Sequence, residues 1–321
     1  MPSELRTSEH EIKIAAPAES VYRLLAHAEN WPQLFPPNIY VDHVERTGRE
    51  ERIRIWATAG DTVKNWTSRR TLDPDRLRID FRQEVSTPPV AAMGGTWQVE
   101  ALPSGETLLR LGHDFRATDD EGLTWLEEVV DRNSRSELDS LKALAESRDG
   151  DGDGATDELT CSFEDTVQIK GAAQDVYDFI WEADLWSERL PHVMTVRLDE
   201  PVPGLQTLEM DTLSKDGSTH TTKSHRVGLA PHRIAYKQTT LPALITLHTG
   251  YWTFTPNDDG VAASSQHTFT VDTGNIAKVL GADATVQDAI AYVRTALSTN
   301  SMATLGIAKT YAEGLAGAGR S

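Results

Sequence analysis

The chain has 321 residues, 39% hydrophobic and 25% charged, which is the composition of a folded globular protein and excludes a disordered or collagen-like chain. This length suits two domains of ordinary size. Lys and Arg number 31 against 49 Asp and Glu, so the net charge is −18 and binding to nucleic acid or to anionic lipid is disfavoured. The single cysteine, Cys161, excludes an internal disulfide and an all-thiolate zinc site.

The N-terminal residues lack the pattern of a signal peptide, and no apolar stretch is long enough to span a membrane. We therefore expect a cytoplasmic protein that binds neither nucleic acid nor membrane.

The first half predicts a strand, two helical segments, a run of strands and a long helix. Alternation predicts a strand at His10–Ile14, and Val21, Leu24 and Leu25 share one face of a helix after Pro17. A Trp-led turn or short helix follows at Trp31–Phe35. Period-two alternation then predicts strands at Arg52–Ala57, Val63–Thr71, Leu77–Glu84, Thr96–Ala101 and Thr107–Phe115. Apolar residues at helical spacing predict a long helix over roughly Gly122–Glu146.

Residues 148–158 have the sequence RDGDGDGATDE, with no apolar periodicity. This composition is typical of a solvated linker.

The second half repeats the first in the same order. Ile12–Lys13–Ile14 recurs as Val167–Gln168–Ile169, 155 positions later. The other matched pairs are Trp31 and Trp186, Ser68-x-Arg70 and Ser224-x-Arg226, Gly95-x-Trp97 and Gly250-x-Trp252, His113-x-Phe115 and His267-x-Phe269, and Asn133–Ser134 and Asn300–Ser301. A collinear series of this length indicates a duplicated domain.

We therefore expect an α+β fold written twice. Each copy is a curved antiparallel sheet wrapped on a long C-terminal helix, with a cavity between them. The predicted domains are residues 1–147 and 159–321, joined by the linker 148–158.

Two strands carry polar residues on a face that would line such a cavity. Lys64, Trp66, Ser68 and Arg70 alternate on one face in the first copy, and His220, Thr222, Ser224 and Arg226 do so in the second. An arginine on a strand is commonly solvated. Its recurrence in both copies favours instead a fixed positive charge that stabilises an oxyanion or enolate.

His113 and His267 lie on the alternating face of the strand that follows each Gly-x-Trp pair. Such a histidine is either a hydrogen-bonded core residue or a general acid or base, and both interpretations stay open. Four tryptophans, Trp31, Trp97, Trp186 and Trp252, fit core packing or ligand contact. Arg82 lies on the strand face opposite Phe81, so its role and that of Met93 are ambiguous.

Several chemistries are not predicted. The sequence has no Gly-x-Gly-x-x-Gly or Walker loop, no His-Glu-x-x-His or paired-cysteine spacing and no Gly-x-Ser-x-Gly elbow. We therefore expect no metal and no cofactor, and any catalysis would act by holding a flexible substrate near an arginine and a proton-transfer group.

The chain resembles the two-domain aromatase/cyclases of bacterial type II polyketide synthases. The residues that carry the resemblance are Trp31–Phe35, Trp66-x-Ser68-x-Arg70, Arg82 and Trp97, and it covers nearly the whole chain, once per half. Lys64 and Asn38 stand where the single-domain pattern has Trp and Tyr, and Thr222 stands in place of Trp66. The resemblance implies a helix-grip (START/Bet v 1-like) fold.

It also implies that the protein folds a reactive poly-β-ketone, delivered on an acyl carrier protein, and directs one aldol closure followed by dehydration. Two-domain members usually close the first ring between C7 and C12 of a chain already reduced by a ketoreductase. Further partners would be the ketosynthase/chain-length factor and the ketoreductase.

The resemblance assigns catalysis to Arg70, Ser68 and His113, helped by Asp131, and to Arg226, Ser224 and His267 in the second half, which could instead serve structure only. The expected substrate-binding residues are Trp31, Phe35, Trp66, Arg82, Met93, Trp97, Asp131, Trp186, Thr222 and Trp252. A non-catalytic carrier of hydrophobic ligands and an assembly scaffold remain alternatives.

Overall fold

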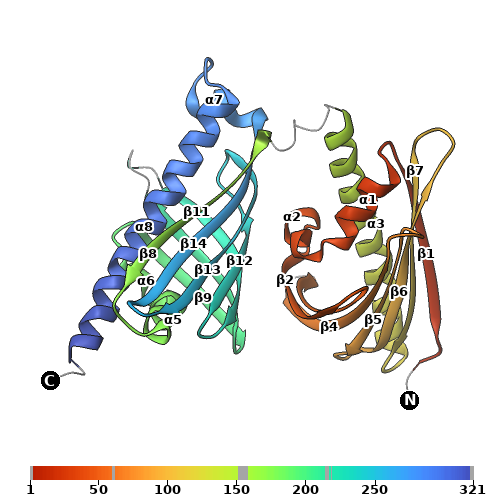
Figure 1. Cartoon of the computed structure of the whole chain (residues 1–321), viewed down its shortest axis with the longest axis horizontal. Coiled ribbons are helices and arrows are strands. Elements are labelled where there is room, and N and C mark those ends of the chain that lie inside the picture. The colour runs from red at the N-terminus through yellow and green to blue at the C-terminus, as the bar shows by residue number, and fades with distance from the viewer. Residues whose placement is uncertain (1–2, 60–61, 151–157, 214–216, 218, 319–321) are drawn as a thin grey trace. The chain divides into compact units, whose positions relative to one another are not determined.

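The computed structural model describes residues 3–59, 62–150, 158–213, 217 and 219–318. The chain forms two compact units, Met1–Thr156 and Asp157–Ser321 (Figure 1). Residues 151–157 of the expected linker lie outside the described residues. The long helix of the first unit continues to Gly150, so the start of the expected linker at residue 148 is helical and the first domain does not end at residue 147.

The first unit contains seven strands and four helical segments among its described residues. In chain order these are β1 (Arg6–Ile14), α1 (Ala18–Ala26), η1 (Ala28–Asn30), α2 (Trp31–Leu34), β2 (Asn38–Thr47), β3 (Glu50–Ala59), β4 (Thr62–Asp73), β5 (Arg78–Val85), β6 (Val90–Ala101), β7 (Thr107–Ala117) and α3 (Asp120–Gly150). The strands form one antiparallel sheet in the order β1-β7-β6-β5-β4-β3-β2.

The second unit repeats this architecture. Its elements are β8 (Thr160–Ile169), α5 (Ala173–Trp181), η2 (Ala183–Leu185), α6 (Trp186–Arg189), β9 (Val193–Val202), β10 (Leu205–Leu213), β11 (Thr219–Leu229), β12 (Arg233–Thr240), β13 (Ile245–Asn257), β14 (Gly260–Val271), η3 (Thr273–Asn275), α7 (Ile276–Leu280) and α8 (Val286–Ala318). The sheet order β8-β14-β13-β12-β11-β10-β9 is that of the first unit. The second unit differs by two additional short helical segments, η3 and α7, before its last helix.

The duplicated α+β fold expected from the sequence is confirmed, and Figure 1 shows one long helix lying along the curved sheet in each unit. The strand at β2 was not predicted. It is an edge strand whose last four residues are exposed. Its buried residues, Asn38, Ile39 and Val41, do not alternate regularly with exposed ones. Within the described residues, no helix is both long enough and apolar enough to span a bilayer.

Helix α3 separates the interior of the first unit into two apolar regions. Leu138 and Leu141 join the main core under α1, while Leu126 and Val130 pack with Phe115 in a smaller cluster. Between these apolar turns the helix presents Asn133, Ser134 and Glu137 to the sheet, so the interior is open and polar there.

The repeated Gly-x-Trp motif is explained by a close approach of neighbouring strands. A Cβ added at Gly95 would lie 2.0 Å from the carbonyl oxygen of Gly112 and 2.7 Å from the Phe81 ring. At Gly250 it would lie 2.2 Å from the oxygen of Gln266 and 2.5 Å from the Tyr236 hydroxyl. Only glycine fits at either position.

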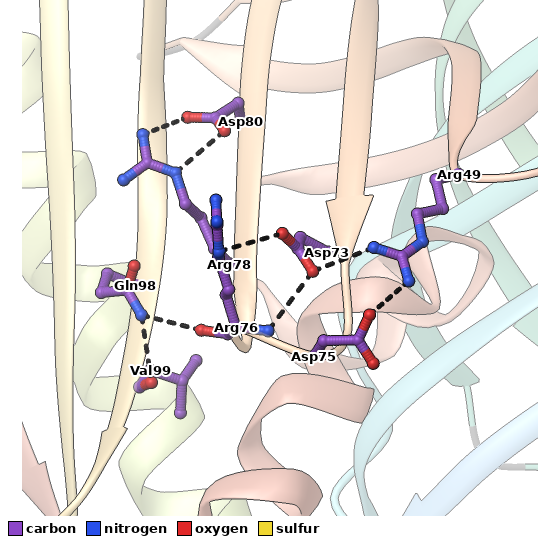
Figure 2. A network of polar contacts seen from close by, with 8 residues as sticks. All are labelled: Arg49, Asp73, Asp75, Arg76, Arg78, Asp80, Gln98 and Val99. Atoms are coloured by element: carbon purple, nitrogen blue, oxygen red, sulfur yellow. Dashed lines mark hydrogen bonds and ion pairs between the residues drawn. The ribbon is translucent and has the colours of Figure 1, made fainter.

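An ion network stabilises the turn that joins β4 to β5 (Figure 2). Arg49, at the end of the β2–β3 hairpin, binds Asp73 at 3.1 Å and also Asp75. Leu77 in this turn has a φ of 49°, a left-handed conformation that a leucine adopts only under constraint. These side chains are not among the residues that line the cavity, so the network has a structural role here.

Candidate functional site

The first unit encloses a cavity of about 210 Å³ between its sheet and α3. The structure places seven of the expected first-half residues besides His113 on its wall: Trp31, Phe35, Trp66, Ser68, Arg70, Met93 and Trp97. The remaining lining residues are Pro37, Asn38, Ile55, Ala57, Thr58, Lys64, Phe81, Gln83, Trp125, Leu126, Val129, Val130, Asn133, Ser134 and Glu137. The wall is therefore largely apolar, with a few polar groups at defined positions.

Strand β4 defines the depth of the cavity. Along its inward face Lys64 is exposed and Trp66 half-buried, whereas Ser68 and Arg70 are only 3% and 2% exposed. The face therefore runs from an open mouth at Lys64 to a closed end at Arg70, about 20 Å apart at the usual rise of a strand.

Arg70 closes the deep end and is also tied to the protein. Its guanidinium donates to the carbonyl oxygens of Leu25 at 3.1 Å and Ala26 at 2.8 Å, which end helix α1. It forms an ion pair with buried Glu51 at 2.5 Å and stacks over the Trp31 ring at 4.9 Å. Arg70 is thus a helix C-cap whose charge a carboxylate neutralises.

One donor of Arg70 is left over. Among the described residues, the buried Nε has no hydrogen-bond partner. A substrate oxygen at the closed end of the cavity is the kind of acceptor that would satisfy it.

His113 and Glu137 are the titratable pair of the cavity. Burial lowers the pKa of His113 to about 4, so the ring is neutral at neutral pH. Its Nδ1 lies 3.5 Å from the Ser134 hydroxyl, and its ring meets Phe81 edge-on at 5.5 Å. Burial raises the pKa of Glu137 to about 7, so this carboxyl exists in both protonation states near neutrality. Burial favours the neutral form of both groups, and strongly shifted groups in a cavity are candidates for acid/base chemistry.

The structure corrects the expected positions of Arg82 and Asp131. Arg82 points away from the cavity and binds Asp114 with two hydrogen bonds, of 2.5 and 2.9 Å. Asp131 lies on the outer side of α3, where it binds His10 at 2.8 Å and Arg135 at 2.9 Å. Hydrogen bonds from these two residues lower the pKa of Asp131 to about 2, so it is a surface carboxylate and not a partner of His113.

Glu137 takes the place that sequence analysis gave to Asp131. The signal was present, because Glu137 is seven residues after Val130 and four before Leu141, on the apolar stripe of the helix. An acid on that stripe is either a buried functional group or a destabilising one. Asn133, Gln83 and Trp125 were also missed.

The second unit holds the counterpart of Arg70 in a similar place. Arg226 donates to the carbonyl oxygen of Ile180 at 2.5 Å, at the end of α5, and to the side-chain oxygen of Gln206 at 2.8 Å. Its guanidinium lies between the rings of Trp181 and Trp186, at 5.2 and 5.1 Å. Gln206 stands where the first unit has Glu51, so no carboxylate neutralises this arginine through that contact.

His267 belongs to a buried hydrogen-bond network. Its Nε2 lies 2.6 Å from the Ser301 hydroxyl, and its Nδ1 lies 2.8 Å from Tyr236 Oη and 3.0 Å from His248 Nε2. Burial lowers its pKa to about 4. Ser224, Thr222, Trp186 and Trp252 are also buried. Where His113, Phe81 and Met93 of the first unit are half-exposed to a cavity, their counterparts here are buried against one another.

Metal ligation has no visible basis in the described part of the chain, where no group of three His, Cys, Asp or Glu side chains is placed to hold an ion.

Fold and site together define a tandem helix-grip protein whose first domain encloses a cavity lined by His113 and Glu137. The chain belongs to the polyketide cyclase/dehydrase and lipid transport family, whose pattern it matches twice, over residues 6–146 and 160–305. The expected family and helix-grip fold are thereby confirmed.

Relatives of similar length support this membership. A granaticin polyketide synthase bifunctional cyclase/dehydratase of Streptomyces virginiae is 52% identical over 93% of this chain and 97% of its own length. An actinorhodin polyketide synthase bifunctional cyclase/dehydratase of Streptomyces coelicolor is 44% identical over 92% of this chain and 93% of its own length.

Two solved structures match both domains. The di-domain aromatase/cyclase BexL of the BE-7585A pathway is 58% identical with a TM-score of 0.85, over 96% of this chain and 99% of that one. StfQ, the di-domain aromatase/cyclase of the steffimycin pathway, is 37% identical with a TM-score of 0.87, over 97% of this chain and 99% of that one.

Proposed function

We propose that this protein is a bifunctional cyclase/dehydratase of a type II polyketide synthase and that its first domain carries the chemistry. The substrate would be a poly-β-ketone on an acyl carrier protein, already reduced at one carbonyl. The reaction would be aldol closure of the first ring, between C7 and C12, followed by loss of water. The observation that carries the proposal is the pair His113 and Glu137 in one semi-apolar cavity, with pKa values shifted in opposite directions.

The cavity supplies proximity. A flexible polyketone has many carbon pairs that can react, and holding one pair together is worth on the order of 7–11 kcal/mol in an intramolecular closure. Trp31, Phe35, Trp66, Met93 and Trp97 give the wall its apolar shape and would fix how the chain folds.

Glu137 can perform every proton movement of both steps. In the aldol step the carboxylate removes a proton from the attacking methylene, and the carboxylic acid so formed gives that proton to the carbonyl oxygen as the carbon–carbon bond forms. In the dehydration it takes a second carbon-bound proton and returns it to the departing hydroxyl as water. A group with a pKa of about 7 suits this cycle, because both forms are populated near neutral pH.

His113, Ser68 and Arg70 would hold the substrate oxygens. The neutral imidazole of His113 can donate or accept a hydrogen bond without adding charge, while Ser68 and the free Nε of Arg70 lie toward the closed end. Donors placed where an enolate oxygen develops stabilise it most strongly in a dry site.

For the second domain, Ser224, Arg226 and His267 remain candidates for the later dehydration or for structure alone. Mutual burial of His267 with Tyr236 and Ser301 favours the structural role. Trp186, Thr222 and Trp252 would then be packing residues.

The test reconstitutes the minimal synthase (ketosynthase/chain-length factor and carrier) and the ketoreductase with each variant, and identifies the products. Glu137→Gln should abolish the correctly cyclised aromatic product, whereas Glu128→Gln, a change on the exposed face of the same helix, should not. A carrier of hydrophobic ligands, the main alternative, would bind the polyketide yet leave the product spectrum unchanged in every variant. That outcome would refute catalysis.

A further inference from the structure

The mouth of the first-domain cavity has a chemical character of its own. Among the described residues that line the cavity, only Lys64 and Trp125 are exposed, Trp125 by 40%. Lys64 comes from β4 and Trp125 from α3, so the opening has a cation on the sheet side and an indole on the helix side.

Lys64 is the cavity cation that carries a free charge. The other lining cation, Arg70, is neutralised by Glu51. The Lys64 ammonium forms no ion pair or hydrogen bond with any residue of the chain that the structure describes. An exposed ammonium beside an apolar opening attracts an anion that arrives with an apolar or flexible group.

Lys64 lies far along β4 from the polar residues at the closed end of the cavity. It precedes Ser68 by four residues and Arg70 by six along the strand, which places its backbone about 13 and 20 Å from theirs. The anion it binds therefore stays at the mouth while the reacting carbons lie deep in the cavity. This arrangement suits a substrate that is held by a tether, with a negative charge on the tether at the mouth.

We propose that Lys64 and Trp125 form a binding site for the phosphopantetheine arm of the carrier protein, an inference that rests on the function proposed above. The Lys64 ammonium pairs with the phosphodiester, and the Trp125 indole packs against the arm where it enters. The first turns of α3 carry Asp120, Glu121 and Glu128 in exposed positions, while Glu127 is paired with Arg6, so this end of the helix repels a phosphate. This repulsion directs the phosphodiester to the β4 side of the mouth.

The site can be tested by binding alone, without turnover. Calorimetric titration at low salt would compare 4′-phosphopantetheine with pantetheine, which lacks the phosphate. The native chain should bind the phosphorylated probe about threefold to fivefold more tightly, as expected for an exposed ion pair, and the preference should shrink as salt is added. Lys64→Met should remove the preference. The matched control Lys278→Met, an exposed lysine of the second domain, should retain it.

Trp125→Ser distinguishes the role of Trp125 from that of Lys64, because it should weaken the binding of 4′-phosphopantetheine and of pantetheine to the same extent. Equal affinity of the native chain for the two probes would overturn the proposal, as would an equal effect of Lys64→Met and Lys278→Met.

Titration with holo-carrier, apo-carrier and coenzyme A then tests the source of the phosphate. We expect tighter binding of the holo-carrier than of the apo-carrier, which lacks the arm, and a loss of that difference in Lys64→Met. Binding of coenzyme A without binding of the holo-carrier would overturn the assignment of the phosphate to a carrier protein. Phosphate discrimination without product in the reconstituted synthase would refute the proposed function and leave this site standing.

Discussion

Arg70 and Arg226 recur in the two halves because each closes the end of a buried helix. Both guanidiniums donate to the last carbonyl groups of the first helix of their domain and stack on tryptophan rings. A charge that serves as a helix cap is retained whether or not its domain catalyses a reaction. The helix cap is therefore sufficient to explain why the Ser-x-Arg motif recurs, and Arg70 combines this cap with a place on the wall of the first-domain cavity.

Replacing Arg70 is consequently expected to destabilise the fold as well as to alter the cavity wall. Removing the guanidinium leaves the Glu51 carboxylate buried without its partner, so Arg70→Met should lower the free energy of unfolding by about 3–5 kcal/mol. Chemical denaturation measures this loss.

The double variant Arg70→Met/Glu51→Gln removes both charges and should recover at least half of that stability. It also isolates catalysis, because a stable double variant that still fails to cyclise the substrate would assign Arg70 to the reaction. No recovery in the double variant would contradict the ion-pair argument.

Glu137 links stability to pH. Its carboxyl has a pKa of about 7 in the folded chain and near 4.5 when unfolded, so the folded state holds the proton more tightly. The stability that this proton contributes is fully present below pH 4.5 and is lost as the pH rises to about 7. Glu137→Gln should therefore be more stable than the native chain at pH 8, by about 1–3 kcal/mol, and equal to it at pH 4.

Thermal unfolding of the two proteins across that range measures the difference. A constant difference at all pH values would show that Glu137 ionises normally and would remove the basis for its proposed role.

At the scale of elements, the cavity exists because α3 interrupts its apolar stripe. Leu126 and Val130 hold one end of the helix on the sheet and Leu138 and Leu141 hold the other. The turn between them carries Asn133, Ser134 and Glu137. The sheet contributes its own constraint at Gly95, where neighbouring backbone and Phe81 leave no room for a side chain.

Gly95→Ala should lower the free energy of unfolding by several kcal/mol, because its Cβ would overlap the Gly112 oxygen, a backbone atom that cannot move aside. Gly112→Ala is the matched control on the neighbouring strand, since its nearest atom lies 4.0 Å away. We expect that variant to unfold within about 1 kcal/mol of the native chain. Equal losses in the two variants would show that the cost comes from glycine replacement in general.

For the whole molecule, duplication has produced two domains with the same topology and different interiors. Phe81, Met93 and Leu111 of the first domain correspond to Tyr236, His248 and Ser265 of the second, which hydrogen-bond around His267. Buried hydrogen bonds of this kind favour one arrangement of a core.

Tyr236→Phe should therefore lower the stability of the second domain by about 1–3 kcal/mol and leave the products of the reconstituted synthase unchanged. His267→Asn should behave alike. An altered product spectrum from either variant, with the fold intact by circular dichroism, would assign catalysis to the second domain.

The sequence by itself determined the duplication, the α+β class, the curved sheet with its long helix, and most of one cavity wall. Those follow from local information, because periodicity records which face of a strand or helix is buried, and a collinear repeat records ancestry. The strand face with Trp66, Ser68 and Arg70 was predicted in this way, and it does line the cavity.

Only the tertiary structure decided what each polar residue does there. Whether an arginine is free depends on residues distant in sequence, Glu51 and the end of α1 for Arg70 and Asp114 for Arg82. Whether Asp131 or Glu137 is the carboxyl that lines the cavity depends on how α3 is rotated against the sheet. The pKa values that make a pair of residues chemically useful arise from burial, which exists only once the chain has folded.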